Sequence, residues 1–110
     1  MPSSNTLRSQ EIRNVSGYEK TERILKALAD RSRLQILECI QKGVSNPGEM
    51  ARKLGRHRST VEKHLRVLLK ACIVEKVPSL TKGGQLSIRY KICENAEELL
   101  CTVQDLCQRF

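Results

Sequence analysis

The side chains best suited to a chemical role lie between Glu49 and Lys76. From Ser59 onward, apolar residues recur at helical spacing, at Val61, Leu65, Leu68 and Cys72. The opposite side of this predicted helix carries Ser59, Glu62, Lys63, Arg66 and Lys70. Hydroxyl and cationic groups on one helix face suit the base edges and phosphates of the DNA major groove. The plainer alternative is an amphipathic helix with a solvated charged face.

The charge of the chain favours a polyanionic partner. The formal net charge is +8, from 20 Lys and Arg against 12 Asp and Glu. Much of the excess lies in residues 52–76, whereas the segment after Cys93 is mainly acidic and has Arg109 as its only base. A basic face on a less basic remainder indicates nucleic acid. Aromatic residues make up only 3% of the chain, which argues against recognition of single strands by stacking.

Five cysteines, an odd number, occur without an apolar signal region or a stretch long enough to cross a membrane. We therefore expect a cytoplasmic protein, in which cysteines are thiols, metal ligands or redox sensors rather than a disulfide framework. They are Cys39, Cys72, Cys93, Cys101 and Cys107.

The positions of these cysteines limit what they can bind. Cys101 and Cys107 fall on different sides of a predicted terminal helix, so that helix cannot hold a metal ion by itself. A metal site would need ligands from two protomers, and no cofactor is predicted. Cys39 and Cys107 lie on apolar stripes and are expected to be buried. Cys101 lies opposite the stripe and is the best candidate for an exposed, oxidisable thiol.

Helical and turn signals indicate one domain over residues 18–110. It follows a polar, flexible arm at residues 1–17, in which a helical turn could form at about 7–15. Apolar spacing predicts helices over about 19–29, from a cap at Asp30 or Ser32 to Gly43, and from Ser45 to Gly55. Gly55 can adopt the positive φ that ends a helix. The recognition helix already described then follows, which completes a helix-turn-helix.

A β-hairpin and a last helix complete the predicted fold. Residues 81–84 form a turn between two extended segments, and the apolar residues of the second segment alternate with polar and basic ones. We expect a wing with one buried face and one cationic face. From Asn95 onward an apolar stripe returns, with more apolar surface than a small domain can cover alone. The predicted fold is mainly α with a small β-hairpin: a winged helix-turn-helix that dimerises through its N- and C-terminal helices.

Three segments carry a resemblance to a known family. LKALADRSRLQIL (25–37), RSTVEKHLRVLLKACIVE (58–75) and the wing ending in IRYKI resemble the ArsR/SmtB-type winged helix-turn-helix transcriptional regulators. This resemblance implies a homodimer, joined through the first and last helices, that binds operator DNA. It also implies base reading by the helix that holds Ser59, Thr60 and Lys63, and, in many members, release from DNA when a metal or oxidant binds.

The chain departs from the family pattern at the sensing sites. Residues 46–54 lack the cysteines of the arsenic-type site, and both histidines, His57 and His64, lie near the recognition helix instead of in the last helix. His57 could cap that helix or contact phosphate, whereas His64 is expected to be packed. Cys72 replaces the glycine that usually ends the recognition helix in the family, so this cap is expected to be strained or built differently.

These observations predict a sequence-specific DNA-binding transcriptional regulator, a repressor, that binds an inverted-repeat operator in double-stranded DNA as a homodimer. No constellation of catalytic residues is present in the sequence, so an enzyme is not expected. The predicted DNA-binding residues are Arg56, His57, Arg58, Ser59, Thr60, Glu62, Lys63, Arg66, Lys70, Lys82 and Arg89. A thiol sensor at Cys93, Cys101 and Cys107 is a further hypothesis, and Cys39 paired with Cys101 or Cys107 is its variant. The alternative function is a winged-helix module that binds protein.

Overall fold

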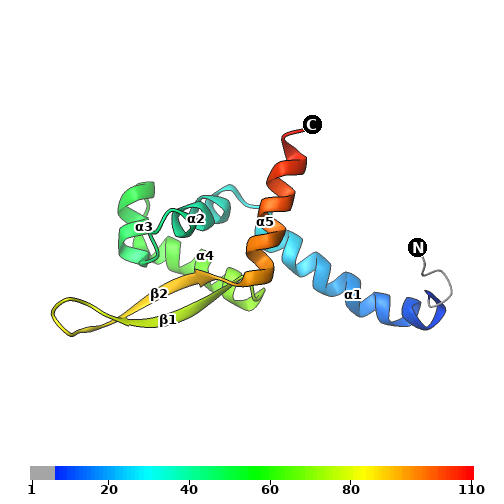
Figure 1. Ribbon diagram of the computed structural model, residues 1–110, viewed down its shortest axis with the longest axis horizontal. Helices are drawn as coiled ribbons and strands as arrows, with labels where there is room; N and C mark the ends of the chain where they lie inside the picture. Colours follow the sequence, from blue (N-terminus) through cyan, green and yellow to red (C-terminus); the bar gives the residue numbers. More distant parts are fainter. Residues whose placement is uncertain (1–6) are drawn as a thin grey trace.

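The computed structural model describes the backbone of residues 7–110 and the side chains of residues 18–110. This part of the chain consists of five helices and a two-stranded antiparallel hairpin, which confirms the predicted winged helix-turn-helix (Figure 1). The elements are α1 (Leu7–Leu28), α2 (Arg31–Gln41), α3 (Pro47–Leu54), α4 (Arg58–Lys70), β1 (Val74–Leu80), β2 (Leu86–Ile92) and α5 (Glu94–Cys107).

The first helix is longer than the sequence indicated. It was expected over about 19–29, but α1 begins at Leu7. Gly17 lies inside it. The helix can continue through this residue because a glycine in a helix interior costs only about 1 kcal/mol. Residues 7–17 of the predicted arm are thus helical backbone, and its first six residues lie outside the described part of the chain.

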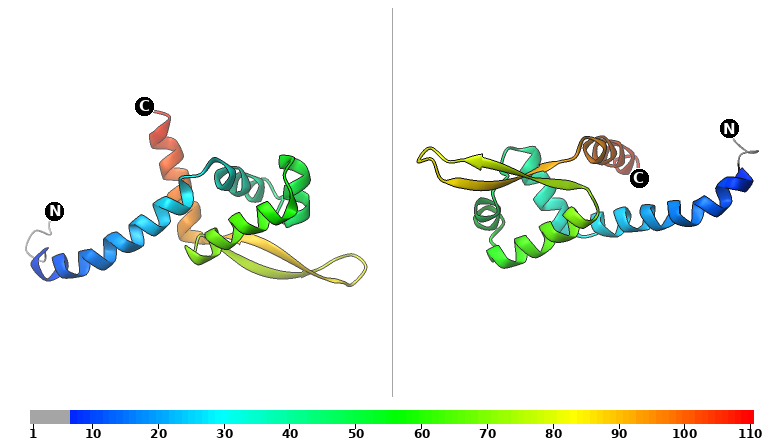
Figure 2. Two further views of the ribbon diagram at one scale, coloured as in Figure 1. Left: turned by 180° about the vertical axis from the view of Figure 1, so that it is seen from behind. Right: turned by 90° about the horizontal axis from the view of Figure 1, so that it is seen from below.

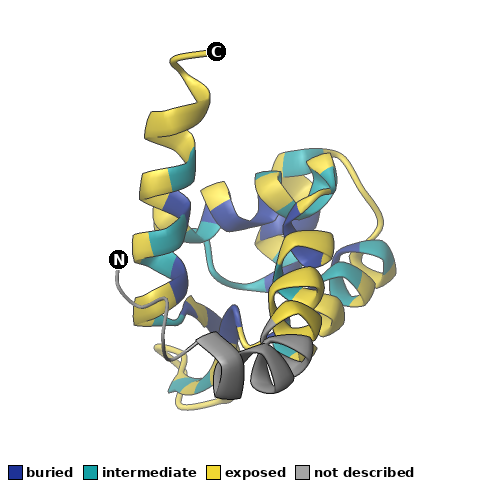
Figure 3. Cartoon of the chain, turned by 90° about the vertical axis from the view of Figure 1, so that its right-hand side faces the viewer, coloured by how far each residue is buried: buried dark blue, intermediate teal, exposed yellow. Residues whose placement is uncertain are grey.

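The core is built around one face of α4. The predicted stripe residues Val61, Leu65 and Leu68 are at most 1% exposed. They pack in one cluster with fully buried side chains from the neighbouring elements: Ile36, Leu37, Met50 and Ile73. Figure 3 shows the buried residues gathered where the helices meet, with exposed residues on their outer sides. The other side of α4 is consequently left facing solvent.

Side-chain caps fix where α2 and α3 begin. The Asp30 carboxylate accepts a hydrogen bond from the backbone N–H of Arg33 at 3.1 Å. The Asn46 side chain accepts from the N–H groups of Gly48 and Glu49 at 2.9 and 3.3 Å, and Pro47 occupies the first turn. These contacts satisfy N–H groups that have no partner within a helix. Both helix starts were predicted from the sequence, with Ser32 as the alternative cap for α2.

Three helices end in the same way, but only two of them use glycine. After α2 and α3, Gly43 (φ 91°) and Gly55 (φ 65°) adopt the left-handed conformation. After α4, Cys72 adopts it with φ 60°. Its N–H donates to the Leu69 carbonyl at 3.0 Å, and the Ile73 N–H donates to the Leu68 carbonyl at 2.9 Å, the pair of bonds of a Schellman motif. Cys72 is exposed and lies past the end of α4, so its placement on the apolar stripe was wrong.

The hairpin projects beyond the helices (Figure 2). Its register pairs Val74 with Ile92 at the base and Leu80 with Leu86 at the tip. Only the base is packed: Tyr90 and Ile92 are buried, whereas Leu86 is 71% exposed. The prediction of one continuous buried face is therefore wrong for the outer half of the hairpin, because no other element of the described chain reaches that far.

The last helix is buried only at its base. Ala96 and Leu100 are buried, whereas Leu106 is 46% exposed and Phe110, which follows the helix, is fully exposed. Cys107 is exposed too, so the expectation of a buried thiol fails for the single chain. The excess of apolar surface predicted for this segment is thus present. No described helix is long and apolar enough to span a membrane.

Replacing Cys72 by glycine should stabilise the protein. A side chain in the left-handed region costs about 1 kcal/mol or more, and Cys72 is the only described non-glycine residue with positive φ. We expect Cys72→Gly to raise the free energy of unfolding in urea under reducing conditions by about 1 kcal/mol. Cys72→Ala, which keeps the strain and removes only the thiol, is the control. Equal stability of the two variants would contradict a strained cap.

Candidate nucleic-acid interface

The exposed face of α4 presents a row of hydrogen-bonding and cationic side chains. Ser59, Lys63, Arg66 and Lys70 follow one another at intervals of four, three and four residues, which places them on one side of the helix. All four are exposed and lie on the side opposite the buried stripe of α4. The geometry therefore confirms the exposure of this predicted face. The partner that it binds is a separate question.

One of the predicted cations is partly neutralised. The Arg58 Nε donates to Glu62 Oε2 at 3.1 Å, and the two side chains remain 63% and 41% exposed. An exposed pair of this kind contributes about 0–1 kcal/mol to stability, so it is readily exchanged for another partner. Glu62 thus positions Arg58 at the start of α4 and lowers the positive charge there. Thr60 beside this pair is half-buried.

The turn before α4 presents Arg56 and His57. Both are exposed, and His57 occupies the N-cap position with an extended backbone. Its carbonyl accepts from Thr60 and Val61, but its imidazole makes no capping hydrogen bond. The suggestion that its side chain caps the helix is therefore wrong. The ring is free to face a ligand at the positive end of the helix dipole.

The two predicted wing cations differ in their surroundings. Lys82 is exposed in the turn between the strands. Arg89 lies on β2, and its Nη1 donates to Ser45 Oγ at 3.2 Å. The neighbouring Tyr90 N–H donates to the Ser45 carbonyl at 3.0 Å. Arg89 therefore helps to fix the hairpin to the connection between α2 and α3, in addition to contributing charge.

Sequence reasoning missed Lys76. This exposed residue lies opposite Tyr90 in the hairpin register. With Arg58 it lines a hollow of about 410 Å³ between the start of α4 and the hairpin, where Glu62 and Asn46 also lie. Lys76 lies two residues after buried Val74, so both side chains share one face of β1. This spacing was the signal that could have placed Lys76 on the side of the hairpin that faces α4. The cationic surface thus continues from α4 onto the base of the wing.

A second omission is Arg33, which joins α4 to the end of α1. Its side chain is only 16% exposed, and its guanidinium donates to the carbonyls of Ala27 and Lys26 at 2.6 and 3.1 Å. Nη1 lies 3.3 Å from Nδ1 of His64 and 3.8 Å from the Asp30 carboxylate. Because Arg33 can only donate, the geometry requires a neutral His64 that accepts at Nδ1. The expectation of a packed, hydrogen-bonded His64 is confirmed.

This arrangement lowers the pKa of His64. Burial of the ring is the largest cause, and the positive charge of Arg33 acts in the same direction, whereas Asp30 partly opposes it. The pKa of Asp30 is itself lowered, first by the hydrogen bond from the Arg33 N–H. His64 thus favours the neutral form that Arg33 requires.

The cysteines do not form a metal site within the described part of one chain. No group of three or more His, Cys, Asp or Glu side chains there is placed to hold a metal ion. Cys39 is buried, which raises its thiol pKa. This burial disfavours the sensor variant that relies on Cys39. Cys101 is exposed as predicted, and Cys93 is half-buried at the N-cap of α5.

The fold and this surface define the class of the molecule, a winged helix-turn-helix protein. Residues 28–77 match a family described as a helix-turn-helix domain. A curated relative, the HTH-type transcriptional regulator Rv2034 of Mycobacterium tuberculosis, is 38% identical over 68 residues, which are 62% of this chain. The chain spans 64% of the length of that relative.

Solved structures agree with this class. The homodimeric winged helix-turn-helix DNA-binding domain of Mb0332 from Mycobacterium bovis, a possible ArsR-family transcriptional regulator, is 27% identical. It matches with a TM-score of 0.75 over 87% of this chain and 85% of that one. Reduced HlyU from Vibrio cholerae shares the fold, with a TM-score of 0.63 and 23% identity over 88% of this chain and 96% of its own. The resemblance found in the sequence is thereby confirmed.

The His64 contact predicts a loss of stability at acidic pH. A histidine whose pKa is lower in the folded state stabilises the protein fully above its unfolded-state pKa of about 6.5. That contribution is lost as the pH falls through the lower folded-state value. We expect the free energy of unfolding to fall more between pH 7.5 and pH 5 for the parent than for His64→Gln, which cannot titrate. A His64 pKa above about 6.5 in an NMR titration would contradict the prediction.

Proposed function

We propose that this chain is a transcriptional regulator of the ArsR/SmtB type, a repressor that binds an inverted-repeat operator in double-stranded DNA as a homodimer. The observation that carries the proposal is the outward-facing row from Ser59 to Lys70, held in place by the buried stripe on the other side of α4. The relatives support it: one is described as a transcriptional regulator, and one as a homodimeric DNA-binding domain.

Within this proposal, the two halves of the surface have different tasks. Ser59 and Lys63 near the start of α4 read base edges in the major groove, which requires hydrogen-bonding groups on a narrow helix face. Arg66 and Lys70 further along α4, and Lys82 at the tip of the wing, contact phosphates and carry no sequence preference. Arg58 exchanges Glu62 for phosphate on binding, since their pairing is exposed and weak.

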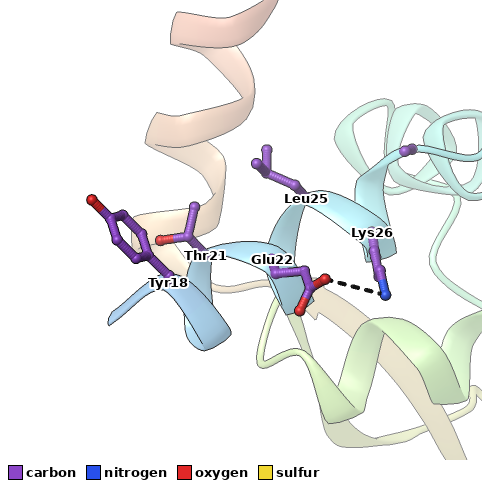
Figure 4. A pocket seen from close by; sticks show the side chains of 6 residues that line it. Tyr18, Thr21, Glu22, Leu25 and Lys26 are labelled. Carbon is purple, nitrogen blue, oxygen red and sulfur yellow. Dashed lines mark ion pairs between the residues drawn. The ribbon is translucent and has the colours of Figure 1, made fainter. Parts of the chain in front are cut away.

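Exposed apolar side chains on α1, on α5 and just after α5 support the proposed dimer. On α1, Tyr18 is 71% exposed and Leu25 is 55% exposed. Figure 4 shows both side chains, with Thr21, projecting from α1 beside the ion pair of Glu22 and Lys26. They line a hollow of about 380 Å³. Leu106 on α5 and Phe110 just after it are exposed as well, and a second copy that packs on both helices would cover these apolar side chains.

A response to oxidants or metal ions through Cys93, Cys101 and Cys107 remains a prediction. Its support is that Cys101 and Cys107 are exposed on the helix assigned to the proposed dimer interface. A metal ion would have to be shared between protomers, because one chain offers no complete ligand group in its described part.

Most of the free energy of DNA binding should be electrostatic, and the preference for particular bases should come from the start of α4. On a duplex selected from a random library, measured by fluorescence anisotropy, the log–log salt slope should change by about 0.9 for each phosphate that a variant no longer neutralises. Arg66→Ala and Lys82→Ala should weaken selected and random duplexes alike. Ser59→Ala and Lys63→Ala should also reduce the preference for the selected duplex, by about 1–3 kcal/mol for each good contact between a side chain and a base.

Lys91→Ala is the matched control for this experiment. Lys91 carries the same charge, but it lines a hollow with Glu94, Glu97 and Glu98 of α5 and not with residues of α4. We expect this substitution to leave DNA affinity almost unchanged. Binding that does not depend on salt would overturn the DNA proposal and favour the protein-binding module.

A charge placed in the apolar surface should separate the protomers. Leu25→Asp and Leu106→Asp should each give a monomer in sedimentation at micromolar concentration, because a buried, unpaired carboxylate is costly. DNA affinity should fall as well, since a dimer places two recognition helices about 34–36 Å apart on an inverted repeat. Leu86→Asp, at a more exposed position on the wing, should remain dimeric. A monomeric parent protein would contradict the proposed assembly.

A further inference from the structure

Two cysteines lie where the recognition helix, the hairpin and the last helix meet. Cys72 follows α4 and precedes β1, and Cys93 connects β2 to α5. We propose that Cys72 and Cys93 form a reversible dithiol–disulfide pair that is oxidised by hydroperoxides. This inference does not depend on DNA binding, and the pair differs from the thiols of α5 because it includes Cys72.

The backbone brings the two residues to neighbouring positions. The hairpin register pairs Val74 with Ile92. One residue beyond this pair, on the side away from the tip, the Cys93 N–H donates to the Ile73 carbonyl at 2.9 Å, so the ladder continues to Ile73 and Cys93. Cys72 is therefore the chain neighbour of the residue that faces Cys93. Directly opposite residues of an antiparallel ladder have Cα atoms about 4.5–5.5 Å apart, and Cys72 is one residue removed from that pair. Disulfides form between residues whose Cα atoms lie within about 7 Å.

Cys72 also faces the first turns of the helix that Cys93 precedes. It lines a cavity of about 300 Å³ together with Asn95, Ala96 and Leu99 of α5. The cavity gives a small oxidant space beside the Cys72 thiol. The main chain and the cavity thus indicate the same meeting point, at the start of α5.

The environments of the two thiols assign different roles to them. Cys93 is half-buried, and burial is the largest cause of its raised pKa. The Glu75 carboxylate, which also hydrogen-bonds to the thiol, and the nearby Cys72 act in the same direction. Cys72 is exposed. An oxidant therefore meets Cys72 first, and Cys93 is the thiol that resolves the product.

The conformation of Cys72 is a further argument for a role of its thiol. Glycine fills the same left-handed position after α2 and α3 without strain. At the end of α4 the chain instead carries a residue that costs about 1 kcal/mol there. Strain of this kind suggests a function for the side chain, and Cys72 is exposed, so packing does not account for it.

The chemistry proceeds in two balanced steps. The Cys72 thiolate attacks a peroxide oxygen: an S–O bond forms, the O–O bond breaks, and water (or the alcohol of an organic hydroperoxide) leaves after proton transfer, which gives a sulfenic acid. The Cys93 sulfur then attacks the sulfenyl sulfur: the S–S bond forms, the S–O bond breaks, and water leaves. Two electrons pass from the two thiols to the peroxide, and a dithiol reductant reverses the change.

The test uses the full chain with Cys39, Cys101 and Cys107 replaced by serine. After hydrogen peroxide treatment, thiol titration should show the disappearance of both remaining thiols, and peptide mapping should show a Cys72–Cys93 linkage within one chain. Dithiothreitol should restore both thiols. Persistence of both thiols, or linkage only between chains, would overturn the proposal.

Two further variants serve as controls. Cys72→Gly suits the left-handed cap and should fold, as checked by circular dichroism, yet Cys93 should keep its thiol over the same exposure to peroxide. A second variant carries Cys39→Ser, Cys72→Gly and Cys107→Ser and so keeps only Cys93 and Cys101. It should form no intramolecular linkage. Oxidation of the Cys93 thiol at the parent rate in Cys72→Gly would show that Cys72 does not mediate the reaction.

Discussion

Burial of one side of α4 is the constraint on which the rest of the structure depends. Val61, Leu65 and Leu68 are almost completely removed from solvent, and burying such side chains contributes about 1.5–3 kcal/mol each. Rotating α4 to hide its other face would expose these residues and bury the cations of Lys63 and Arg66, which is costly without partners. The same apolar contacts that hold the domain together thus decide which residues α4 offers to a ligand.

The wing depends on a smaller set of contacts. Only Val74, Tyr90 and Ile92 at its base are packed, and Ser45 joins it to the connection before α3 through two hydrogen bonds. Beyond that point the hairpin relies on its own ladder. A two-stranded ribbon is marginally stable alone, so its outer half can adapt to a surface while its base stays fixed relative to α4.

The fold was largely readable from the sequence because its signals are local. Asn46 followed by Pro47, the glycine at 55 and the stripe of α4 each specify a helix end or face within a few residues. The failures were matters of tertiary context. Alternation predicts that Leu86 shares a face with Tyr90, but only the position of other elements decides whether that face is covered. Gly17 gave the appearance of a boundary inside a continuous helix.

The candidate site, like the fold, has parts that the sequence predicts and parts that it does not. Exposure of Ser59, Lys63 and Arg66 follows from helical period, so the row was predictable. The Arg58–Glu62 pair follows the same helical spacing, and the two-residue spacing of Lys76 from Val74 places both on one face of β1. The role of Arg33 and the contact of Arg89 with Ser45 could not be predicted, since each involves a partner whose position the local pattern does not specify. The identity of the ligand remains a proposal, because exposed charge alone is compatible with more than one partner.

Two sets of contacts join α4 to α1 and α5, the helices assigned to the proposed dimer. In the middle of α4, His64 is joined to the end of α1 through Arg33. At its end, Cys72 leads into the ladder whose last bond, from Cys93 to Ile73, adjoins α5. Few contacts therefore relate the orientation of α4 to the surfaces of α1 and α5. Regulators of this kind need a coupling free energy of only about 1–3 kcal/mol between effector and DNA. Under the proposed function, a change at either joint would alter how α4 is held, although Ala27 of α1 and Ile73 after α4 also join these elements through the buried core.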